Sequence, residues 1–342
     1  MTTSSPTAES TDSTAVYEDS GPTISSVHPD IIHNHILNRL DGPTLASTAC
    51  ASSQLRRLCT EETLWRKLCI SKWPSTENPL VQDVVTTFSG GQRSLFADSF
   101  SVLGYSSDMK QSDRSFLSGD LISAVDIYYQ DKPIFSKVHR TETQAGWFLC
   151  SPFWIDLLDP EDPVPTPVKY TRKDEELLKH LEDNLSLSWI AIDPTQKRAA
   201  NLSSWRPVLV QRHWMTRDLD VLFAVVMASD RAASELVQFK IKVTCSGKVG
   251  GDMQVNEVSL MVEDMDGRHV NGKESMVILR SAMENGKRKK VNDEETKVNF
   301  DKFSSMKKEK REMKQRIEKA MDMASIVIAI SMFIFFCWFM FA

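Results

Sequence analysis

The sequence predicts an α+β fold: a short three-helix module, then a mainly antiparallel β-sandwich-like domain, then a C-terminal transmembrane helix. Three observations support this prediction. Apolar residues recur at helical spacing within residues 26–74, and short β-branched and aromatic runs alternate with turn residues across 88–284. Residues 324–342 carry no charge at all. These patterns are typical of a helical module, of strands and of a membrane span, respectively.

Residues 1–25 form a polar segment that we expect to be disordered. The segment is rich in Ser, Thr and Pro, and it contains acidic but no basic residues. Such a composition cannot bury enough apolar surface to offset the entropy lost on ordering. It also lacks the cationic start and apolar run of a secretory or organellar presequence.

Residues 26–74 have the spacing of three short helices. Pro29 and Asp30 suit a first helical turn, and the apolar residues that follow share one helical face: Ile32, Ile36, Leu37 and Leu40. A second helix is predicted to begin near Thr44 and a third near Thr60; their apolar residues are Leu45, Ala49, Leu55, Leu58, Leu64 and Trp65. A module this small cannot bury all of these faces, so part of the apolar surface should meet a partner or the next domain.

At these residues the segment resembles an F-box. The matching positions are Pro29-Asp30, Ile32, Ile36-Leu37, Arg39-Leu40, Leu45 and the closing Leu64-Trp65 pair, and the 40–47 and 73–75 segments look like a plant subfamily. Three positions depart from the family pattern, because His28 replaces the usual Leu, Ala51 a common Val and Leu55 a common Trp. The smaller side chains leave less apolar area to bury, which predicts weaker binding of a partner.

The resemblance implies both a partner and a function. F-box domains dock on the Skp-type adaptor of a cullin-RING (SCF) ubiquitin ligase. In this chain the implied adaptor contacts are Pro29, Ile32, Ile36, Leu37, Leu40 and Leu45. The chain is then expected to be a non-catalytic substrate receptor that reaches the cullin through the adaptor. The alternative is a helical cap that packs only on the rest of the chain, in a ligase-independent scaffold.

The region 88–284 predicts eight or nine strands of an antiparallel sandwich or open barrel. The runs that carry this prediction are 121–129, 147–150, 153–158, 187–193, 208–210, 222–226, 237–243, 255–262 and 275–279. The last two runs predict a hairpin or longer return around 264–272, and residues 175–183 are the best local helix candidate.

In F-box proteins this position holds the substrate-recognition domain, which is lectin-like in some plant members. Trp189, Trp205 and Trp214 are candidates for stacking on a sugar or a peptide, and this gives a lectin-like binding protein as a further alternative. We favour the interpretation that these tryptophans are core and sheet-face residues, and that the domain binds a protein substrate.

No motif predicts catalysis, a metal or a cofactor. The six cysteines form no C-x-x-C pair, and the glycine-rich segment 246–251 lacks the ending of a phosphate loop and predicts a hairpin turn. His28, His33 and His35 cluster without an acidic or cysteine complement. We therefore expect the ligase chemistry to belong to partner subunits.

Residues 324–342 predict a transmembrane tail anchor, because about 20 apolar residues in a helix cross a hydrocarbon core. Basic residues in the 285–322 linker predict that the N-terminal part lies in the cytosol, on the endoplasmic reticulum or another secretory membrane. A nuclear import signal at 287–290 and nucleic-acid binding are competing interpretations of this charge. We favour a juxtamembrane helix attracted to anionic lipid, since no aromatic residues are interleaved with the basic ones.

Overall fold

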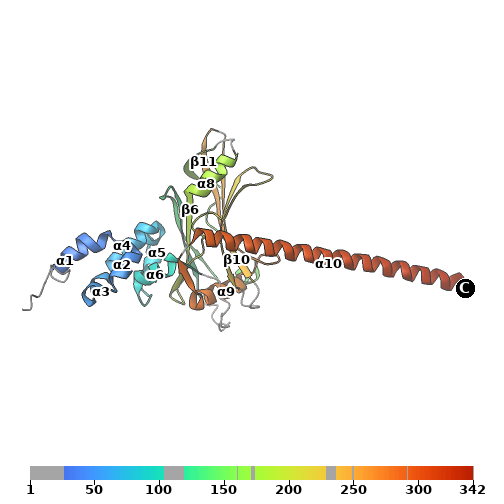
Figure 1. Cartoon of the computed structure of the whole chain (residues 1–342), viewed down its shortest axis with the longest axis horizontal. Coiled ribbons are helices and arrows are strands. Elements are labelled where there is room, and N and C mark those ends of the chain that lie inside the picture. Colours follow the sequence, from blue (N-terminus) through green and yellow to red (C-terminus); the bar gives the residue numbers. More distant parts are fainter. Residues whose placement is uncertain are drawn as a thin grey trace, which may run out of the picture. The chain divides into compact units, whose positions relative to one another are not determined.

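The computed structural model describes residues 27–103, 119–159, 161–170, 174–228, 236–248, 250–290 and 292–341. These residues divide into two compact units, the first ending at Leu64 and the second beginning at Trp65. Helices precede two mainly antiparallel sheets and a long C-terminal helix, which confirms the predicted α+β class (Figure 1). The segment 1–25, which we predicted to be disordered, lies outside the described residues.

The first unit consists of short helical segments. Its elements are α1 (Pro29–Ile31), η2 (Ile32–Ile36), η3 (Leu37–Arg39), α2 (Gly42–Thr48), α3 (Ser53–Cys59) and the beginning of α4 (Glu62–Lys72). The carboxylate of Asp41 accepts a hydrogen bond from the Thr44 N–H, and the hydroxyl of Ser52 accepts one from the Leu55 N–H. These two N-caps explain why the predicted second helix is in fact two helices, since each cap starts a new one.

The second unit continues with helices that the sequence interpretation missed, namely η4 (Pro74–Glu77), α5 (Pro79–Val85) and α6 (Gly91–Phe100). Buried polar contacts hold this segment on the first sheet. The carboxylate of Asp126 accepts hydrogen bonds from the backbone N–H of Ser75 at 2.9 Å and from its hydroxyl at 2.6 Å. The hydroxyl of Tyr128 donates to the carbonyl oxygen of Lys72.

Twelve described strands form two sheets. The first has the order β12 (Arg288–Lys290), β1 (Ser101–Leu103), β7 (Arg198–Asn201), β6 (Leu185–Asp193), β2 (Leu121–Tyr129) and β3 (Lys132–Thr141). The second has the order β4 (Trp154–Asp156), β11 (Asp252–Asp264), β10 (Leu236–Gly247), β9 (Leu219–Ala228) and β8 (Leu209–Arg212), with β5 (Val164–Lys169) also paired to β11. Every described pairing is antiparallel except that of β1 with β7.

One hydrophobic core joins the two sheets, as expected for a sandwich. It contains residues of the first sheet such as Val125 and Trp189, and residues of the second such as Phe223 and Phe239. Three helices contribute further side chains to the same core: α7 (Gly146–Cys150), α8 (Asp174–Asn184) and α9 (Gly272–Asn285).

Two of the predicted strands are wrong. Residues 147–150 lie in α7, and residues 275–279 lie in α9, so the return predicted around 264–272 leads into a helix. Asn271 caps α9 by accepting a hydrogen bond from the Glu274 N–H, which fixes the helical start. The helix predicted at 175–183 is confirmed as α8, and the turn predicted at 246–251 is confirmed between β10 and β11.

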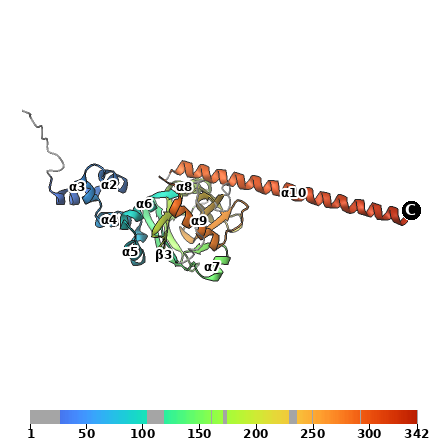
Figure 2. The same ribbon diagram turned by 90° about the horizontal axis from the view of Figure 1, so that it is seen from below.

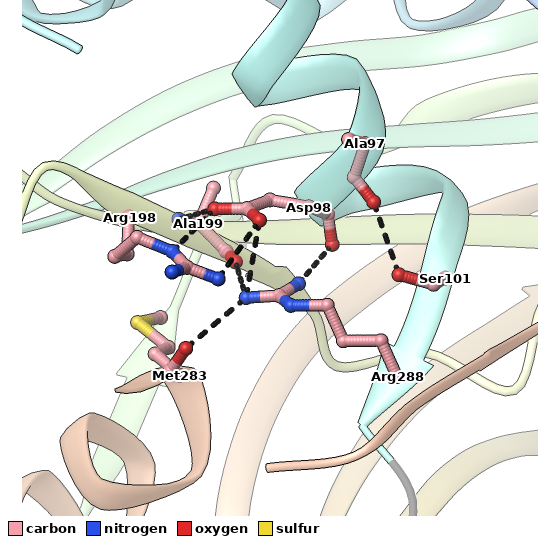
Figure 3. A network of polar contacts seen from close by, with 7 residues as sticks. All are labelled: Ala97, Asp98, Ser101, Arg198, Ala199, Met283 and Arg288. Carbon is pink, nitrogen blue, oxygen red and sulfur yellow. Dashed lines mark hydrogen bonds and ion pairs between the residues drawn. The ribbon is translucent and has the colours of Figure 1, made fainter. Parts of the chain in front are cut away.

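A polar network ties α6, β7 and β12 together (Figure 3). The carboxylate of Asp98 accepts hydrogen bonds from the Arg198 guanidinium at 2.9 and 3.1 Å and from the Ala199 N–H at 3.1 Å. Arg288 lies 3.3 Å from the same carboxylate, and it donates to the carbonyl oxygens of Asp98, Ala199 and Met283. Segments about 100 residues apart in sequence are thereby fixed to one another.

The last helix, α10 (Asp293–Phe341), is continuous from the basic segment to the apolar end (Figures 1 and 2). It is long and apolar enough to cross a membrane, and its most apolar window is fully exposed in the structure.

Candidate functional site

The structure separates the six residues predicted to contact an adaptor into two groups. Ile32, Leu37 and Leu45 are buried, with at most 1% of each side chain exposed. Pro29 and Leu40 are half-buried, and Ile36 is 39% exposed. Without rearrangement, only the second group can offer apolar surface to a partner.

The irregular geometry of the first helical stretch explains this separation. After one α-turn, η2 widens to a π-helical turn, and the N–H of Leu37 donates to the carbonyl oxygen of Ile32 five residues earlier. The buried residues Ile32 and Leu37 have this same five-residue spacing. Ile36, which would share the face of Ile32 in a regular α-helix, is therefore rotated toward solvent.

Sequence reasoning missed Ile31. Its side chain is 51% exposed, and together with Ile36 it forms the exposed large apolar surface of the described part of the first unit. The neighbouring isoleucines Ile31 and Ile32 were both candidates for an adaptor contact. The assumption of a regular helix, with apolar residues four positions apart, selected only Ile32. Both side chains offer apolar area that a partner could bury.

Two histidines of this unit contact other groups of the protein. The Nδ1 of His28 accepts from the Asp30 N–H at 3.3 Å, so this departure from the family pattern serves as a helix N-cap. The Nε2 of His33 lies 2.9 Å from a Glu61 carboxylate oxygen. Of the other departures, Ala51 is exposed and Leu55 is buried.

The three tryptophans proposed for ligand stacking have different environments. Trp189 is fully buried, and its indole N–H donates to the Ser123 hydroxyl at 3.1 Å, so it is a core residue. Trp205 is half-buried and lies 5.4 Å from the Tyr128 ring, measured between centroids. Trp214 is 79% exposed on the loop between β8 and β9.

The first part of α10 packs on the outer face of the second sheet. Phe303 is 1% exposed, and Phe300 packs against Val208, Leu222 and Ala224. Phe300 belongs to α10, and Leu222 and Ala224 belong to β9. This apolar contact therefore holds the first turns of α10 on the sheet and sets the direction in which the helix continues.

Ion pairs extend this contact to the end of β11. Lys307 lies 2.8 Å from the Glu263 carboxylate, and Lys310 lies 3.0 Å from that of Asp266. Burial acts to raise the pKa of Glu263, but the ammonium groups of Lys240 and Lys307 outweigh it and hold this pKa below its usual value. The hydrogen bond from Lys310 likewise lowers the pKa of Asp266.

Gly267 allows the turn after β11 to approach α10. Its φ of +75° favours glycine, and a Cβ atom there would lie 2.8 Å from the Cε of Lys307. Any larger residue would push the basic side chain away from the turn.

Beyond this contact, the described side chains of α10 from Arg311 to Phe341 are exposed, apart from the half-buried Cys337. Its large apolar side chains between Ile326 and Phe341 are each more than half exposed. An apolar surface of this length is costly in water and suits a lipid environment.

Comparisons with known proteins find a family match in the first helices and relatives over most of the chain. A family model described as F-box-like matches residues 29–71. The F-box protein At2g27310 of Arabidopsis thaliana is 42% identical over 92% of this chain and 95% of its own length. The probable F-box protein At2g36090 is 44% identical over 91% of both chains, and the F-box protein At3g44326 is 42% identical over 94% of this chain and 91% of its own; both are from the same plant. No solved structure matches this chain.

Proposed function

This chain belongs to the family of plant F-box proteins, and we propose that it is the substrate receptor of an SCF-type ubiquitin ligase acting at a membrane surface. F-box proteins generally act as substrate receptors that join a Skp-type adaptor, and through it a cullin, to a substrate. The proposal assigns no catalytic residue to this chain, because its contribution is to raise the effective concentration of substrate near the ligase.

The observation that carries the adaptor assignment is the exposed apolar surface of the first helical stretch. Ile31 and Ile36 would contact the adaptor directly, with Pro29 and Leu40 at the margin of the contact. Ile32, Leu37 and Leu45 would support this surface from beneath in the absence of rearrangement.

The test is capture of purified Skp-type adaptor by the full chain in detergent micelles. We expect Ile31→Asp and Ile36→Asp each to weaken capture at least about tenfold, as is usual when an anchor residue is lost. Met215→Asp is the matched control, because Met215 is 65% exposed on a loop of the β-rich unit. Absence of capture by a folded wild-type chain would instead support the ligase-independent scaffold.

The membrane assignment rests on the exposed apolar end of α10 and the basic residues before it. We propose that this helix anchors the chain with both units in the cytosol and the β-rich unit as the substrate-binding part. Alkaline carbonate extraction of microsomes should leave the wild-type chain in the membrane, whereas a chain ending at Met323 should be released. Protection of the N-terminal units from protease in intact vesicles would contradict the orientation.

A further inference from the structure

A small pocket lies in the second unit where α4, α6, β7 and the start of α10 meet. Its volume is about 210 Å³, and its walls include Trp73, Phe100 and Trp205 together with Lys72, Lys290 and Ser99. Neither the adaptor contact nor the membrane helix uses these residues.

The walls of the pocket are aromatic and surround a positive charge. The Nζ of Lys72 lies 5.2 Å from the Trp205 ring centroid, 5.3 Å from that of Phe100 and 5.7 Å from that of Trp73. Rings at these distances attract an ammonium group through their negative faces. A bound group would therefore meet flat apolar surface beside a cation.

Two buried polar atoms of the lining residues have no hydrogen-bond partner among the described residues. They are the indole Nε1 of Trp73 and the hydroxyl oxygen of Ser99, and each residue is 1% exposed. An unpaired buried polar group is unfavourable, and an indole N–H can only donate. A ligand that supplies an acceptor oxygen would remove this cost.

The pocket is also held rigidly. Trp205 has a φ of +66°, a conformation that is strained for a non-glycine residue and is common at functional sites. The backbone N–H of Trp205 donates to the Ser203 hydroxyl, and its carbonyl oxygen accepts from the Leu187 N–H. The Asp98 network fixes α6 and β12, which carry Ser99 and Lys290 (Figure 3).

We propose that this pocket binds a single carboxylate attached to a flat apolar group such as an aromatic ring. Lys72, Lys290, the Trp73 indole and the Ser99 hydroxyl would face the carboxylate, while Phe100 and Trp205 would contact the ring. The two lysines are opposed by one acidic lining residue, Asp293, so the pocket suits a monoanion better than a dianionic phosphate. Its volume equals that of about seven water molecules, which is enough for one small aromatic acid.

The first experiment compares 3-phenylpropanoate with its neutral analogue 3-phenylpropanamide, using calorimetry on the full chain in detergent micelles. We expect the acid to bind and the amide to bind at least about tenfold more weakly, because the amide forms no charge-assisted bond with the lysines. No detectable binding of the acid, or equal binding of the two, would overturn the proposal.

Substitutions in the pocket then test whether the acid binds there. Trp205→Gly removes the ring and introduces a residue that favours positive φ, and it should weaken binding of the acid about tenfold. Trp214→Gly makes the same change on an exposed loop and should leave the affinity for the acid unchanged. Lys290→Met should also weaken binding, unlike Lys248→Met at the exposed β10–β11 turn. Unchanged affinity in both pocket variants, with thermal unfolding confirming that they are folded, would exclude this pocket.

A third arm identifies the source of the carboxylate. A peptide that ends in phenylalanine with a free carboxylate presents the same chemistry as the small acid, and its C-terminal amide is the matched control. Tighter binding of the acid peptide would assign the pocket to the C-terminus of a protein. Binding of the small acid alone would assign it to a free metabolite of this class.

Discussion

Replacing Asp98 should destabilise the β-rich unit more than replacing Arg198, one of the two arginines beside it. The Asp98 carboxylate is 10% exposed and is the point where α6, β7 and β12 meet. Three changes separate its contributions: Asp98→Ala removes the whole carboxylate, Asp98→Asn keeps one acceptor oxygen, and Arg198→Ala removes one donor.

The expected magnitudes follow from burial. Asp98→Ala leaves the buried N–H of Ala199 unpaired and leaves Arg288, whose side chain is 18% exposed, without its counter-charge. Together these effects cost about 3–5 kcal/mol. Arg198 is 40% exposed, so solvent screens its ion pair, and Arg198→Ala should cost about 1 kcal/mol. Asp98→Asn should be intermediate, at about 2 kcal/mol, because its oxygen still accepts from the Ala199 N–H.

Thermal unfolding of the full chain in micelles provides the assay, monitored by circular dichroism. At about 2–4 °C per kcal/mol for a unit of this size, Asp98→Ala should lower the midpoint by roughly 6–20 °C and Arg198→Ala by roughly 2–4 °C. Hydrogen exchange should show the largest loss of protection in β7 and β12. Equal shifts for Asp98→Ala and Arg198→Ala would refute the conclusion that this carboxylate is the centre of the network.

Three further results are expected. Asp126→Ala should cost about 1–3 kcal/mol in thermal unfolding because it leaves a buried N–H unpaired, while Asp126→Asn should cost much less. Gly267→Val should displace Lys307 and increase hydrogen exchange around Phe303, without altering the first unit. The lowered pKa of Glu263 stabilises docking of α10 fully above its unfolded value of about 4.3, and this contribution should be lost as pH falls through the lower folded value. In exchange data corrected for intrinsic rates, Glu263→Gln should reduce this dependence and leave the part due to Asp266, whose pKa Lys310 lowers.

The spacing of apolar residues along the sequence and the local composition were sufficient to predict the fold class, the long strands and α8. They failed where an apolar run was too short to distinguish strand from helix, as at 147–150. For α9 the sequence did contain a usable signal, because Asn271 followed three residues later by Glu274 is a capping pattern. The prediction of a strand at 275–279 relied on the apolar content of these residues and did not use this capping pattern.

The proposed adaptor surface was only partly accessible to sequence reasoning. The F-box resemblance identified the correct segment, since the family model matches 29–71. Assigning individual residues required the wide turn at η2, which buries Leu37 and exposes Ile31 and Ile36. The aromatic pocket was inaccessible for a different reason: Lys72, Phe100, Trp205 and Lys290 are brought together only by tertiary contacts.

Because α10 is continuous, it would act as a rigid lever between the β-rich unit and the membrane in which we propose that its apolar end lies. From Phe303, fixed on the sheet, to Ala324 the helix rises about 32 Å without a break. When the apolar segment tilts by about 20°, which is an average tilt for membrane helices, the docked end swings sideways by about 11 Å. Bilayer thickness would thus set how the β-rich unit is tilted against the membrane plane. A flexible insertion after Arg311 should uncouple the two, as measured by energy transfer to lipid headgroups from a label on the edge of the unit.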